Sequence, residues 1–510
     1  MSHSGKTSEP APIPGGDLPR ECGLGPVYEI ADLPAPPPFS LRNLFHVIGP
    51  GAILLATAIG GGEWLVGPAQ AVQHSLALFW VATAAIVLQL AFNLEAIRYT
   101  LYTGEPIYGG ILRLWPGPKF WGPFYVVLAF LQLCWPALAL SCANTLFSVF
   151  VGRTPDEASS GDELTGKLIA LGLIVGVLIL LHFGGTVERM LETASWFMLA
   201  FIFVFLITVN VVFIPWETWK TTLAGFFGLG KGGEGNIDWN LLGALAATAG
   251  TGGIGNLTIT NWMRDKGFGM GALTGAIGSA VGSKEVKLSP GGKVFPATPS
   301  NLTRWREWMR YVTVDQIWVW ALFCFLGMYL NVNLAVGIIP HGTSLSGLGT
   351  GAYQAQYMAE KLWSGFWFLT LLNGFWILFS TQLGNTDILA RTITDVSWLS
   401  SAKVRGWRGG DVRGVYYTAL FVVSAWAIAT LWLGRALSMF TILANMAGAV
   451  LALAAFQVLI VNRRFLPRAL RPPLWREAFL VACGLFYTFF SAQWIWSTLL
   501  RPLYGRLFGA

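Results

Sequence analysis

The chain contains eleven apolar segments, each long enough to cross a lipid bilayer as a helix. Crossing the hydrocarbon core takes about 20 mostly apolar residues. The segments lie near residues 44–74, 76–98, 121–150, 165–183, 187–214, 239–264, 311–333, 364–384, 414–433, 437–461 and 477–500. Because lipid cannot hydrogen-bond the backbone, so many apolar segments predict an all-α integral membrane protein. The composition agrees, since 54% of residues are hydrophobic and only 12% are charged.

The basic residues predict the orientation of these segments. They gather in the stretches 264–310, 385–413 and 462–476, whereas 152–163 is rich in acidic residues. By the positive-inside rule, this places the N-terminus in the cytoplasm of a multi-pass cell-membrane protein. The net charge of +7 therefore indicates orientation and not nucleic-acid binding.

The distribution of composition predicts two regions. Residues 1–42 are rich in Pro, Gly and charge without an apolar core, so we expect a disordered cytoplasmic tail. Residues 43–510 form a single transmembrane domain, with no room for a soluble catalytic domain. No Ser/His pairing or metal-type His cluster is present, and His46, His74 and His182 are scattered. We therefore expect neither an enzyme nor a bound cofactor.

Glycines interrupt two of the apolar segments. Residues 60–62 are all glycine and precede Glu63, and a second glycine-rich stretch occupies residues 250–253. The sequence Ala-Thr-Ala at 56–58 recurs at 247–249, and in both places two further residues and a glycine pair follow. Paired interruptions in corresponding halves indicate the midplane site of a transporter built from inverted repeats. We assign repeat one to 43–214, repeat two to 235–461 and an additional helix to 477–500.

The two interruptions predict a site that attracts cations. The last carbonyls of a helix carry partial negative charge, which places oxygen ligands near Thr57 and Gly60 and near Gly250 and Thr251. Glu63 adds a formal negative charge at membrane depth, where an ionisable residue indicates function. The alternative is that Glu63 only caps the N-terminus of the half-helix that follows.

Polar residues after the second interruption are further candidates for substrate binding. Asn256 and Thr260 are four residues apart and share a helix face, and Gly253 leaves the backbone open to a substrate. The alternative for these polar side chains is hydrogen bonding between helices.

Three charged residues are candidates for a cytoplasmic gate. Glu95 and Arg98 are three residues apart near the inner end of their segment and can pair, and Asp387 lies near the inner end of another. The alternative is that they are ordinary charged helix ends that reach the membrane surface.

The broken first segment resembles the start of the Nramp family of proton-coupled divalent-metal transporters. Gly49-Pro50-Gly51 matches a family motif, and the family's Asp-Pro-Gly-Asn falls on residues 60–63. The family's Met-Pro-His-Asn-Leu falls on residues 253–257, and smaller similarities occur at Arg98, at 103–104 and at 380–384. The resemblance covers about residues 43–500. It implies the LeuT-type fold, a 5+5 inverted repeat with discontinuous helices 1 and 6.

The metal ligands of the Nramp family are not retained. The family's Asp, Asn and Met ligands fall on Gly60, Glu63 and Gly253, and its helix-6 His falls on Gly255. Without the thioether, the site loses the soft ligand that favours transition metals. The resemblance therefore implies a roomier cation site in which Glu63, Gly60 and Gly250 contact the ion.

Together these features predict a secondary active transporter that moves a cationic substrate by alternating access. The substrate is a divalent metal such as Mg²⁺ or Mn²⁺, or a larger cation. One alternative is a Na⁺-coupled symporter of an organic solute or amine. Another is a sensor that keeps the scaffold without transport. The expected partners are a cationic solute or metal ion and the lipid bilayer, and not nucleic acid.

Overall fold

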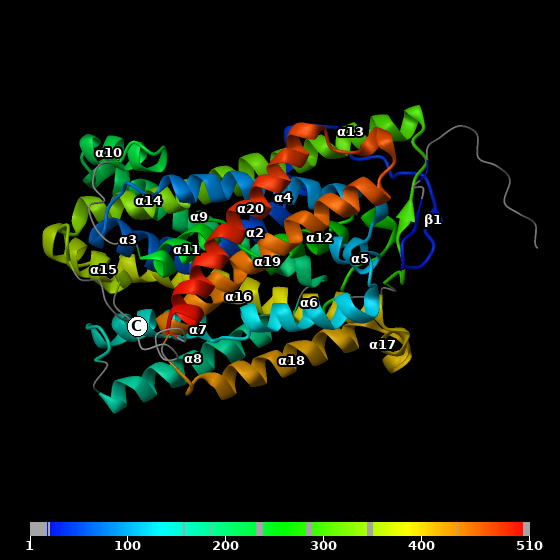
Figure 1. Ribbon diagram of the computed structural model, residues 1–510. Helices are drawn as coiled ribbons and strands as arrows, with labels where there is room; N and C mark the ends of the chain where they lie inside the picture. The colour runs from blue at the N-terminus through cyan, green and yellow to red at the C-terminus, as the bar shows by residue number, and fades with distance from the viewer. Residues whose placement is uncertain are drawn as a thin grey trace, which may run out of the picture.

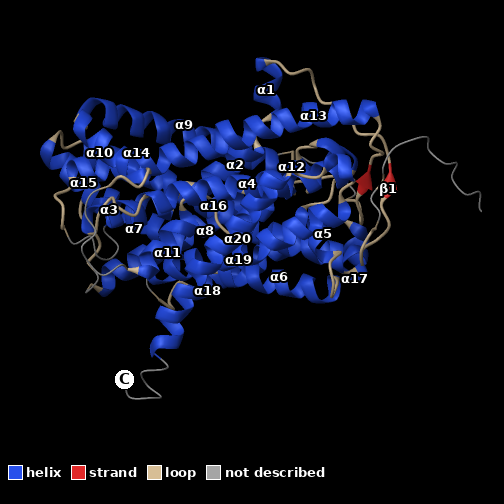
Figure 2. Ribbon diagram, turned by 45° about the horizontal axis from the view of Figure 1, so that its top comes forward, coloured by secondary structure: helices blue, strands red, loops and turns tan. Residues whose placement is uncertain are grey.

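The long helices of the protein run roughly side by side in an elongated bundle (Figures 1 and 2). The computed structural model describes residues 18, 21–156, 159–183, 185–230, 238–281, 288–343, 350–434 and 436–502. Among these residues, ten helices are long and apolar enough to cross a membrane, judged by length and composition.

The first half of the chain is helical apart from one short strand. Its elements are β1 (Glu29–Ile30), α1 (Leu41–Val47), α2 (Pro50–Ala58), the π-helical turn η1 (Gly62–Val66), α3 (Gly67–Gln73), α4 (Trp80–Thr103), α5 (Ile107–Leu112), α6 (Pro118–Leu133), α7 (Ala137–Val151), α8 (Ser160–Leu180), α9 (Val187–Phe213) and α10 (Trp216–Phe226).

The second half has the same character. Its helices are α11 (Trp239–Thr248), α12 (Ile254–Asp265), η2 (Gly269–Leu273), α13 (Pro299–Thr313), the π-helical segment η3 (Val314–Ala321), α14 (Leu322–Ile338), α15 (Thr350–Lys361), α16 (Phe366–Ser400), α17 (Ala402–Gly406), η5 (Trp407–Gly410), α18 (Val412–Thr430), α19 (Ala436–Phe465), η6 (Arg468–Leu470), α20 (Leu474–Ile495) and η7 (Trp496–Leu500). Strand β2 (Lys293–Val294) pairs in parallel with β1.

The helices correspond to the eleven predicted membrane segments, which we number as spans 1 to 11. Ten of them are the long apolar helices counted above, and the eleventh, α11–α12, is not among those ten because its break divides it into two short helices. In chain order, the spans are α2–α3, α4, α6–α7, α8, α9, α11–α12, α13–α14, α16, α18, α19 and α20. The all-α membrane architecture predicted from the sequence is confirmed. Span 8 extends to Ser400, well beyond the predicted end at 384, because its apolar part continues as a buried polar helix.

Both predicted interruptions are present. In span 1, α2 ends at Ala58 and the next helical turn begins at Gly62. In span 6, α11 ends at Thr248 and α12 begins at Ile254. Gly252 and Gly253 have φ angles of 75° and 59°, a left-handed conformation that glycine adopts at no steric cost. The glycines therefore make the second interruption possible.

Span 3 contains a third interruption that the prediction of one segment over 121–150 did not include. Helix α6 ends at Leu133, and α7 begins at Ala137 after Pro136. Proline has no backbone N–H to continue the hydrogen-bonding of the first helix. Pro136 was therefore a signal for this break in the sequence.

The spans form two groups of four. Spans 1, 2, 6 and 7 contact one another through α2, α4, α12 and η3. Spans 3, 4, 8 and 9 contact one another through α7, α8, α16 and α18. The groups meet where α16 packs against α2 and α12. The interruptions of spans 1 and 6 lie close to this contact, so a site there is positioned between two bodies.

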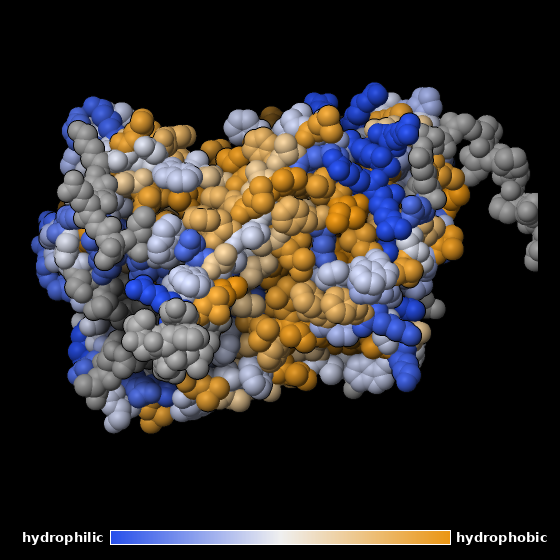
Figure 3. All heavy atoms as spheres, viewed as in Figure 1, coloured by the Kyte–Doolittle hydropathy of each residue, from blue (hydrophilic) through white to orange (hydrophobic). Residues whose placement is uncertain are grey.

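The two ends of the bundle differ in their elements. Strand β1, α5 and α17 lie at one end, which we call the β1 end, and α10 and α15 lie at the other, the α10 end (Figure 1). In the space-filling view, apolar residues cover the middle of the surface and hydrophilic residues gather towards the two ends (Figure 3). This distribution is typical of a protein that crosses a bilayer along its long axis.

The N-terminal region is more ordered than the predicted tail over 1–42. Residues 1–17, 19 and 20 lie outside the described residues. Residues 21–42, however, contain β1, and Leu33 and Tyr28 are buried. The overall composition of residues 1–42 did not predict such apolar contacts. The buried side chains of Tyr28 and Leu33 hold residues 21–42 against the β1 end.

Candidate functional site

A small cavity lies between the interruptions of spans 1 and 6. Its volume is about 20 Å³, which is enough for one water molecule or a dehydrated ion. The lining comes from spans 1, 3, 6, 8 and 10, namely Thr57, Ala58, Gly61, Gly62, Gln132, Leu133, Leu138, Thr248, Gly250, Thr251, Thr381, Asn385, Phe440 and Leu443. No charged side chain is among these lining residues. In this conformation, the cavity is too small for an organic solute.

Three threonine hydroxyls of the lining donate their protons to backbone carbonyls. The Oγ1 of Thr57 donates to the carbonyl of Ile53 at 2.8 Å, and that of Thr248 donates to the carbonyl of Ala244 at 2.7 Å. The Oγ1 of Thr381 donates to the carbonyl of Ile59 at 3.0 Å. Since a hydroxyl has one proton and two lone pairs, only lone pairs remain for the cavity. These three hydroxyls therefore favour a cation over an anion, while Gln132 and Asn385 add side-chain amides to the lining.

Two glutamine side chains satisfy the free amides at the second interruption. The Oε1 of Gln89 accepts a hydrogen bond from the amide of Gly252 at 3.1 Å. The Oε1 of Gln132 accepts one from the amide of Ile254, at the start of α12, at 3.0 Å. A helix N-terminus is a ready-made anion site only while its amides are free. Here these amides are occupied, which again disfavours an anionic ligand.

Glu63 is completely buried beside the first interruption. Its Oε2 accepts a hydrogen bond from the amide of Gly60 at 2.8 Å. Its Oε1 has no hydrogen-bond partner among the described residues. Glu63 is not part of the cavity lining, although its neighbour Gly62 is. The carboxyl group thus caps the half-helix of span 1 and places an ionisable side chain behind the wall of the cavity.

Spans 1 and 8 pack closely at the cavity through two glycines. A side chain at Gly60 would overlap the hydroxyl of Thr381, and one at Gly384 would overlap the hydroxyl of Thr57. Small residues allow this close approach of two membrane helices. The approach brings hydroxyls from both groups of spans to one cavity.

The structure places the predicted binding residues in different positions. Thr57, Gly250 and Thr251 line the cavity, and Gly60 directly precedes the lining residue Gly61. Gly253 lies against the Oε1 of Gln132, where a side chain would overlap it. Its lack of a side chain therefore gives room for the cap on α12.

Asn256 and Thr260 take part in contacts between helices. The Nδ2 of Asn256 donates to the Oδ1 of Asn93 on α4 at 2.9 Å. The Oγ1 of Thr260 donates to the carbonyl of Leu257 at 2.6 Å and accepts from the amide of Ile107 at 3.1 Å. Neither residue lines the cavity. Their contacts correspond to the alternative of hydrogen bonding between helices.

Several lining residues were not among the predicted site residues. Thr248 is the counterpart of Thr57 in the internal repeat, so the repeat itself was a signal for it. Thr381 and Asn385 lie one turn apart on span 8, and Gln132 lies beside the break in span 3. Nothing local distinguishes these three from other polar residues in membrane helices, because their role depends on how distant spans pack.

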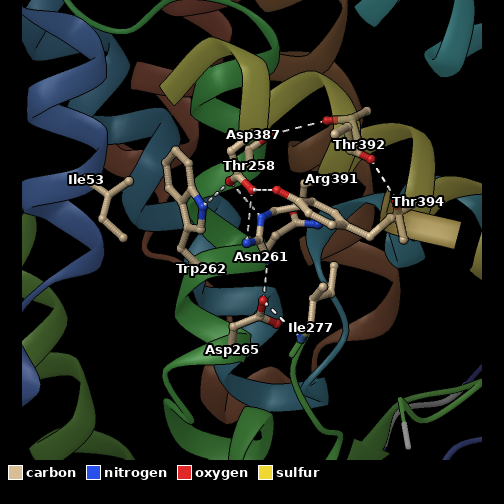
Figure 4. Close-up of polar contacts among 12 residues, drawn as sticks. Ile53, Thr258, Asn261, Trp262, Asp265, Ile277, Asp387, Arg391, Thr392 and Thr394 are labelled. Carbon is tan, nitrogen blue, oxygen red and sulfur yellow. Dashed lines mark hydrogen bonds and ion pairs between the residues drawn. The ribbon is translucent and has the colours of Figure 1, made fainter. Parts of the chain in front are cut away.

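A buried ionic network joins span 6 to span 8 towards the β1 end (Figure 4). The predicted gate residue Asp387 belongs to it, pairing with Arg391 at 2.9 Å. Arg391 also pairs with Asp265 at the end of α12. Arg264 pairs with Asp395 at 2.7 Å. All of these side chains are almost completely buried.

Neutral donors complete this network. The hydroxyl of Tyr416 on span 9 donates to Asp387 at 2.7 Å, and the Nε1 of Trp262 donates to the same carboxylate at 2.9 Å. The Nδ2 of Asn261 donates to Asp395 at 2.5 Å. The network therefore links one group of spans, through α12, to the other, through α16 and α18.

The other two predicted gate residues form a pair on span 2. Arg98 contacts Glu95 at 2.7 Å, and Arg476 contacts the same glutamate at 3.1 Å. Arg98 also donates to the carbonyl of Leu470 at 3.1 Å. This pair connects span 2 to the segment that precedes span 11, and not to the opposite group of spans.

The fold is similar to that of solved transporters. A mutant form of the manganese transporter of Eremococcus coleocola matches with a TM-score of 0.58 at 13% identity, covering 94% of this chain and 91% of that chain. The same transporter in complex with an aromatic bis-isothiourea substituted compound matches with a TM-score of 0.56 at 12% identity, with the same coverage. The chain has a LeuT-type fold. No protein-family model and no curated protein sequence matches it.

The LeuT-type fold agrees with the predicted 5+5 repeat and the discontinuous helices 1 and 6. Both similar structures are of a protein named a manganese transporter. Over the described part of the chain, no group of three or more His, Cys, Asp or Glu residues could hold a metal ion.

A wider cavity of about 270 Å³ lies closer to the α10 end. Its lining includes Asn144, Asp156, Asp162, Glu163 and Lys167. Its helical walls are α7, α8 and α19, and of these α7 and α19 also border the small cavity about one turn further along. The two cavities are thus consecutive along the same helices, and the wider one carries more acidic than basic side chains.

Proposed function

We propose that the protein is a secondary transporter that carries a small, hard cation through the cavity between the interruptions of spans 1 and 6. The observation that carries this proposal is the arrangement of Thr57, Thr248 and Thr381, whose hydroxyl protons are all donated to backbone carbonyls. All three residues line one cavity, and oxygen lone pairs are the ligands that hard cations prefer.

The arrangement of the spans supports transport by alternating access. The cavity lies between the group of spans 1, 2, 6 and 7 and the group of spans 3, 4, 8 and 9. In transporters of this type, one group of helices rocks against the other around a site at the midplane. The network around Arg391 holds the groups together towards the β1 end, so we propose that it closes that side in this conformation.

The lining supports a hard cation and not a soft transition metal. The similar protein from E. coleocola is named a manganese transporter, but the cavity here has no thioether, thiol or imidazole among its lining residues. Hydroxyl and carbonyl oxygens suit ions such as Na⁺ or Mg²⁺ better than soft ions. The resemblance to the Nramp family therefore extends to the fold and the cation class and not to the metal ligands.

The distribution of charged residues supports an orientation in the membrane, and with it the side from which a cation would enter. By the positive-inside rule, the basic residues support a cytoplasmic position for the β1 end and the N-terminus. The wider cavity, with Asp156, Asp162 and Glu163 in its lining, would then face the outside. Asp162 pairs with Arg153 and Glu163 pairs with Lys167, so three acidic side chains stand beside two basic ones, and the attraction of this entrance for cations is modest.

Uptake into proteoliposomes tests the proposal. We expect saturable uptake of at least one of Na⁺, Mg²⁺ and Mn²⁺, and competition between that ion and the others. Liposomes without protein serve as the control. If none of the three ions nor a simple organic amine is taken up or bound, the proposed function is wrong and a transport-inactive sensor becomes the better interpretation.

Replacing Glu63 with glutamine is expected to weaken cation binding by about tenfold, equivalent to about 1.4 kcal/mol. The amide oxygen of Glu63→Gln still accepts the hydrogen bond from Gly60, so the cap is retained while the group that can become negatively charged beside a bound cation is lost. The measurement is the dissociation constant of the transported ion, with thermal unfolding as a check on folding. Unchanged affinity would show that Glu63 acts only as a helix cap.

A further inference from the structure

A proline-rich part of the N-terminal region lies along helix α13. Residues 33–38 read Leu-Pro-Ala-Pro-Pro-Pro, and we call them the proline segment. Proline fixes φ near −65° and favours the extended polyproline-II conformation, whose backbone carbonyls are free to accept hydrogen bonds. The proline segment is therefore a pre-organised peptide ligand within the chain.

Three side chains of α13 donate hydrogen bonds to the carbonyls of this segment. Arg304 donates to Leu33 at 2.7 Å, and the Nε1 of Trp308 donates to Pro34 at 2.9 Å. The hydroxyl of Tyr311 donates to Pro37 at 3.2 Å and to Pro38 at 3.1 Å.

The donors form one continuous face. Positions 304, 308 and 311 follow the spacing i, i+4, i+7 and so lie on one side of the helix. Trp308 and Tyr311 are buried, and the ring of Phe39 packs on that of Tyr311 at 5.1 Å. Arg310 lies over the ring of Phe39 at 4.2 Å. Aromatic grooves with such donors are how proteins recognise polyproline-II peptides.

The residues before the proline segment are also held at the β1 end. The amide of Ala31 donates to the carbonyl of Val294 in β2 at 3.0 Å, and the amide of Leu33 donates to the Oδ1 of Asn301 at 3.3 Å. The guanidinium of Arg113 lies over the ring of Tyr28 at 4.0 Å. Burial raises the pKa of the Tyr28 phenol above its ordinary value, so this ring stays neutral. These contacts bring the proline segment to α13 in a fixed register.

The residues after the proline segment lead directly into span 1. Helix α1 follows it, and the amide of Gly49, just before α2, donates to the Oδ1 of Asp315 at 3.0 Å. Asp315 lies in η3, which continues α13 without a break. One continuous helix therefore holds both the proline segment and the start of span 1.

We infer that the face of α13 formed by Arg304, Trp308 and Tyr311 is a binding site for a polyproline-II peptide, and that the proline segment occupies it and restrains span 1. The second half of this inference rests on the proposed function, since span 1 must move relative to span 8 for the β1 side to open. Release of the segment is then a step that favours opening towards that side.

Amide hydrogen exchange of the full-length protein tests the binding site without reference to transport. In the triple variant Arg304→Ala/Trp308→Phe/Tyr311→Phe, the hydrogen bonds to the proline segment are lost. We expect the amides of residues 29–33 to exchange at least about tenfold faster, because each lost hydrogen bond costs about 1 kcal/mol. The matched control is Arg306→Ala, since Arg306 lies on the same helix but is exposed. Unchanged exchange in the triple variant, or an equal increase in the control, would overturn the binding site.

Adding the proline segment as a separate peptide distinguishes specific binding to α13 from a general loss of structure in the variants. In a second variant, Pro34, Pro36, Pro37 and Pro38 are replaced with glycine, which leaves α13 intact. A synthetic peptide of residues 27–40 should bind this variant in a fluorescence polarisation titration. It should bind neither the triple variant, whose site is altered, nor the wild-type protein, whose site is filled. Equal binding to all three proteins would contradict a defined site.

Thiol labelling tests whether the proline segment restrains span 1. A cysteine at the cavity, Thr57→Cys in a Cys22→Ser background, is labelled with a membrane-impermeant reagent from the side of the β1 end. Adding the glycine substitutions should raise the labelling rate several-fold, and peptide 27–40 should reverse the increase. An unchanged rate, together with faster amide exchange, would overturn the restraint of span 1. Absence of cation uptake by the wild type would instead count against the proposed function, with the exchange result unaffected.

Discussion

Replacing Thr57 and Thr248 together with valine is expected to weaken binding of the transported cation by about 100-fold, if each hydroxyl contributes about 1.4 kcal/mol. Valine has nearly the shape of threonine, so the cavity keeps its walls and loses two oxygen ligands. Each hydroxyl donates to a carbonyl four residues earlier in its own helix. Removal of the hydroxyls therefore leaves the helical backbone bonds in place. The dissociation constant of the ion, measured by calorimetry, gives the effect.

Two controls separate loss of ligands from loss of structure. The double variant Thr57→Ser/Thr248→Ser keeps both oxygens and should bind the ion with an affinity close to that of the wild type. Thr394→Val removes a buried hydroxyl with the same kind of backbone contact, from its Oγ1 to the carbonyl of Ala390 at 2.7 Å, but outside the cavity. An unchanged affinity in Thr57→Val/Thr248→Val would show that the cavity between the interruptions is not the cation site.

The interruptions of spans 1 and 6 could be predicted from the sequence because their cause is local. Three consecutive glycines at 60–62, and the glycine pair at 252–253, weaken a membrane helix wherever it packs. The internal repeat shows that these two interruptions occupy corresponding positions in the two halves of the chain. In a transporter built from inverted repeats, corresponding interruptions lie close together at the midplane. Thr57, Gly250 and Thr251 were found by this reasoning and lie at the cavity.

The contributions of spans 3 and 8 could not be predicted in the same way. Thr381 lines the cavity because Gly60 allows span 8 to approach span 1, which is a property of the packed pair. Likewise, Gln132 caps α12 from a different span. The position of Glu63 could not be predicted either. The sequence places a carboxyl group at the interruption, but the packing of the helices determines that this group lies behind the cavity wall.

The buried ionic network between spans 6 and 8 has two expected effects. It holds the two groups of spans together at the β1 side, and it stabilises the folded protein. Its three carboxylates, of Asp265, Asp387 and Asp395, face only two guanidiniums, of Arg264 and Arg391. These five groups therefore carry one more negative than positive charge, and the neutral donors Tyr416, Trp262 and Asn261 help to offset it. Removing a charged partner from such a site leaves an uncompensated buried charge, which is far more costly than losing an exposed ion pair.

Replacing Arg391 with methionine is therefore expected to lower the free energy of unfolding by about 3–5 kcal/mol. Asp265 and Asp387 would each lose their contact with Arg391 and remain buried. Unfolding in mixed detergent micelles measures the loss. Arg413→Met is the matched control, because Arg413 pairs with Asp411 at a partly exposed position and should cost at most about 1 kcal/mol. The double variant Arg391→Met/Asp387→Asn should recover part of the stability, since it removes one of the buried charges. Equal losses for Arg391→Met and Arg413→Met would contradict a role of this network in holding the two groups of spans together.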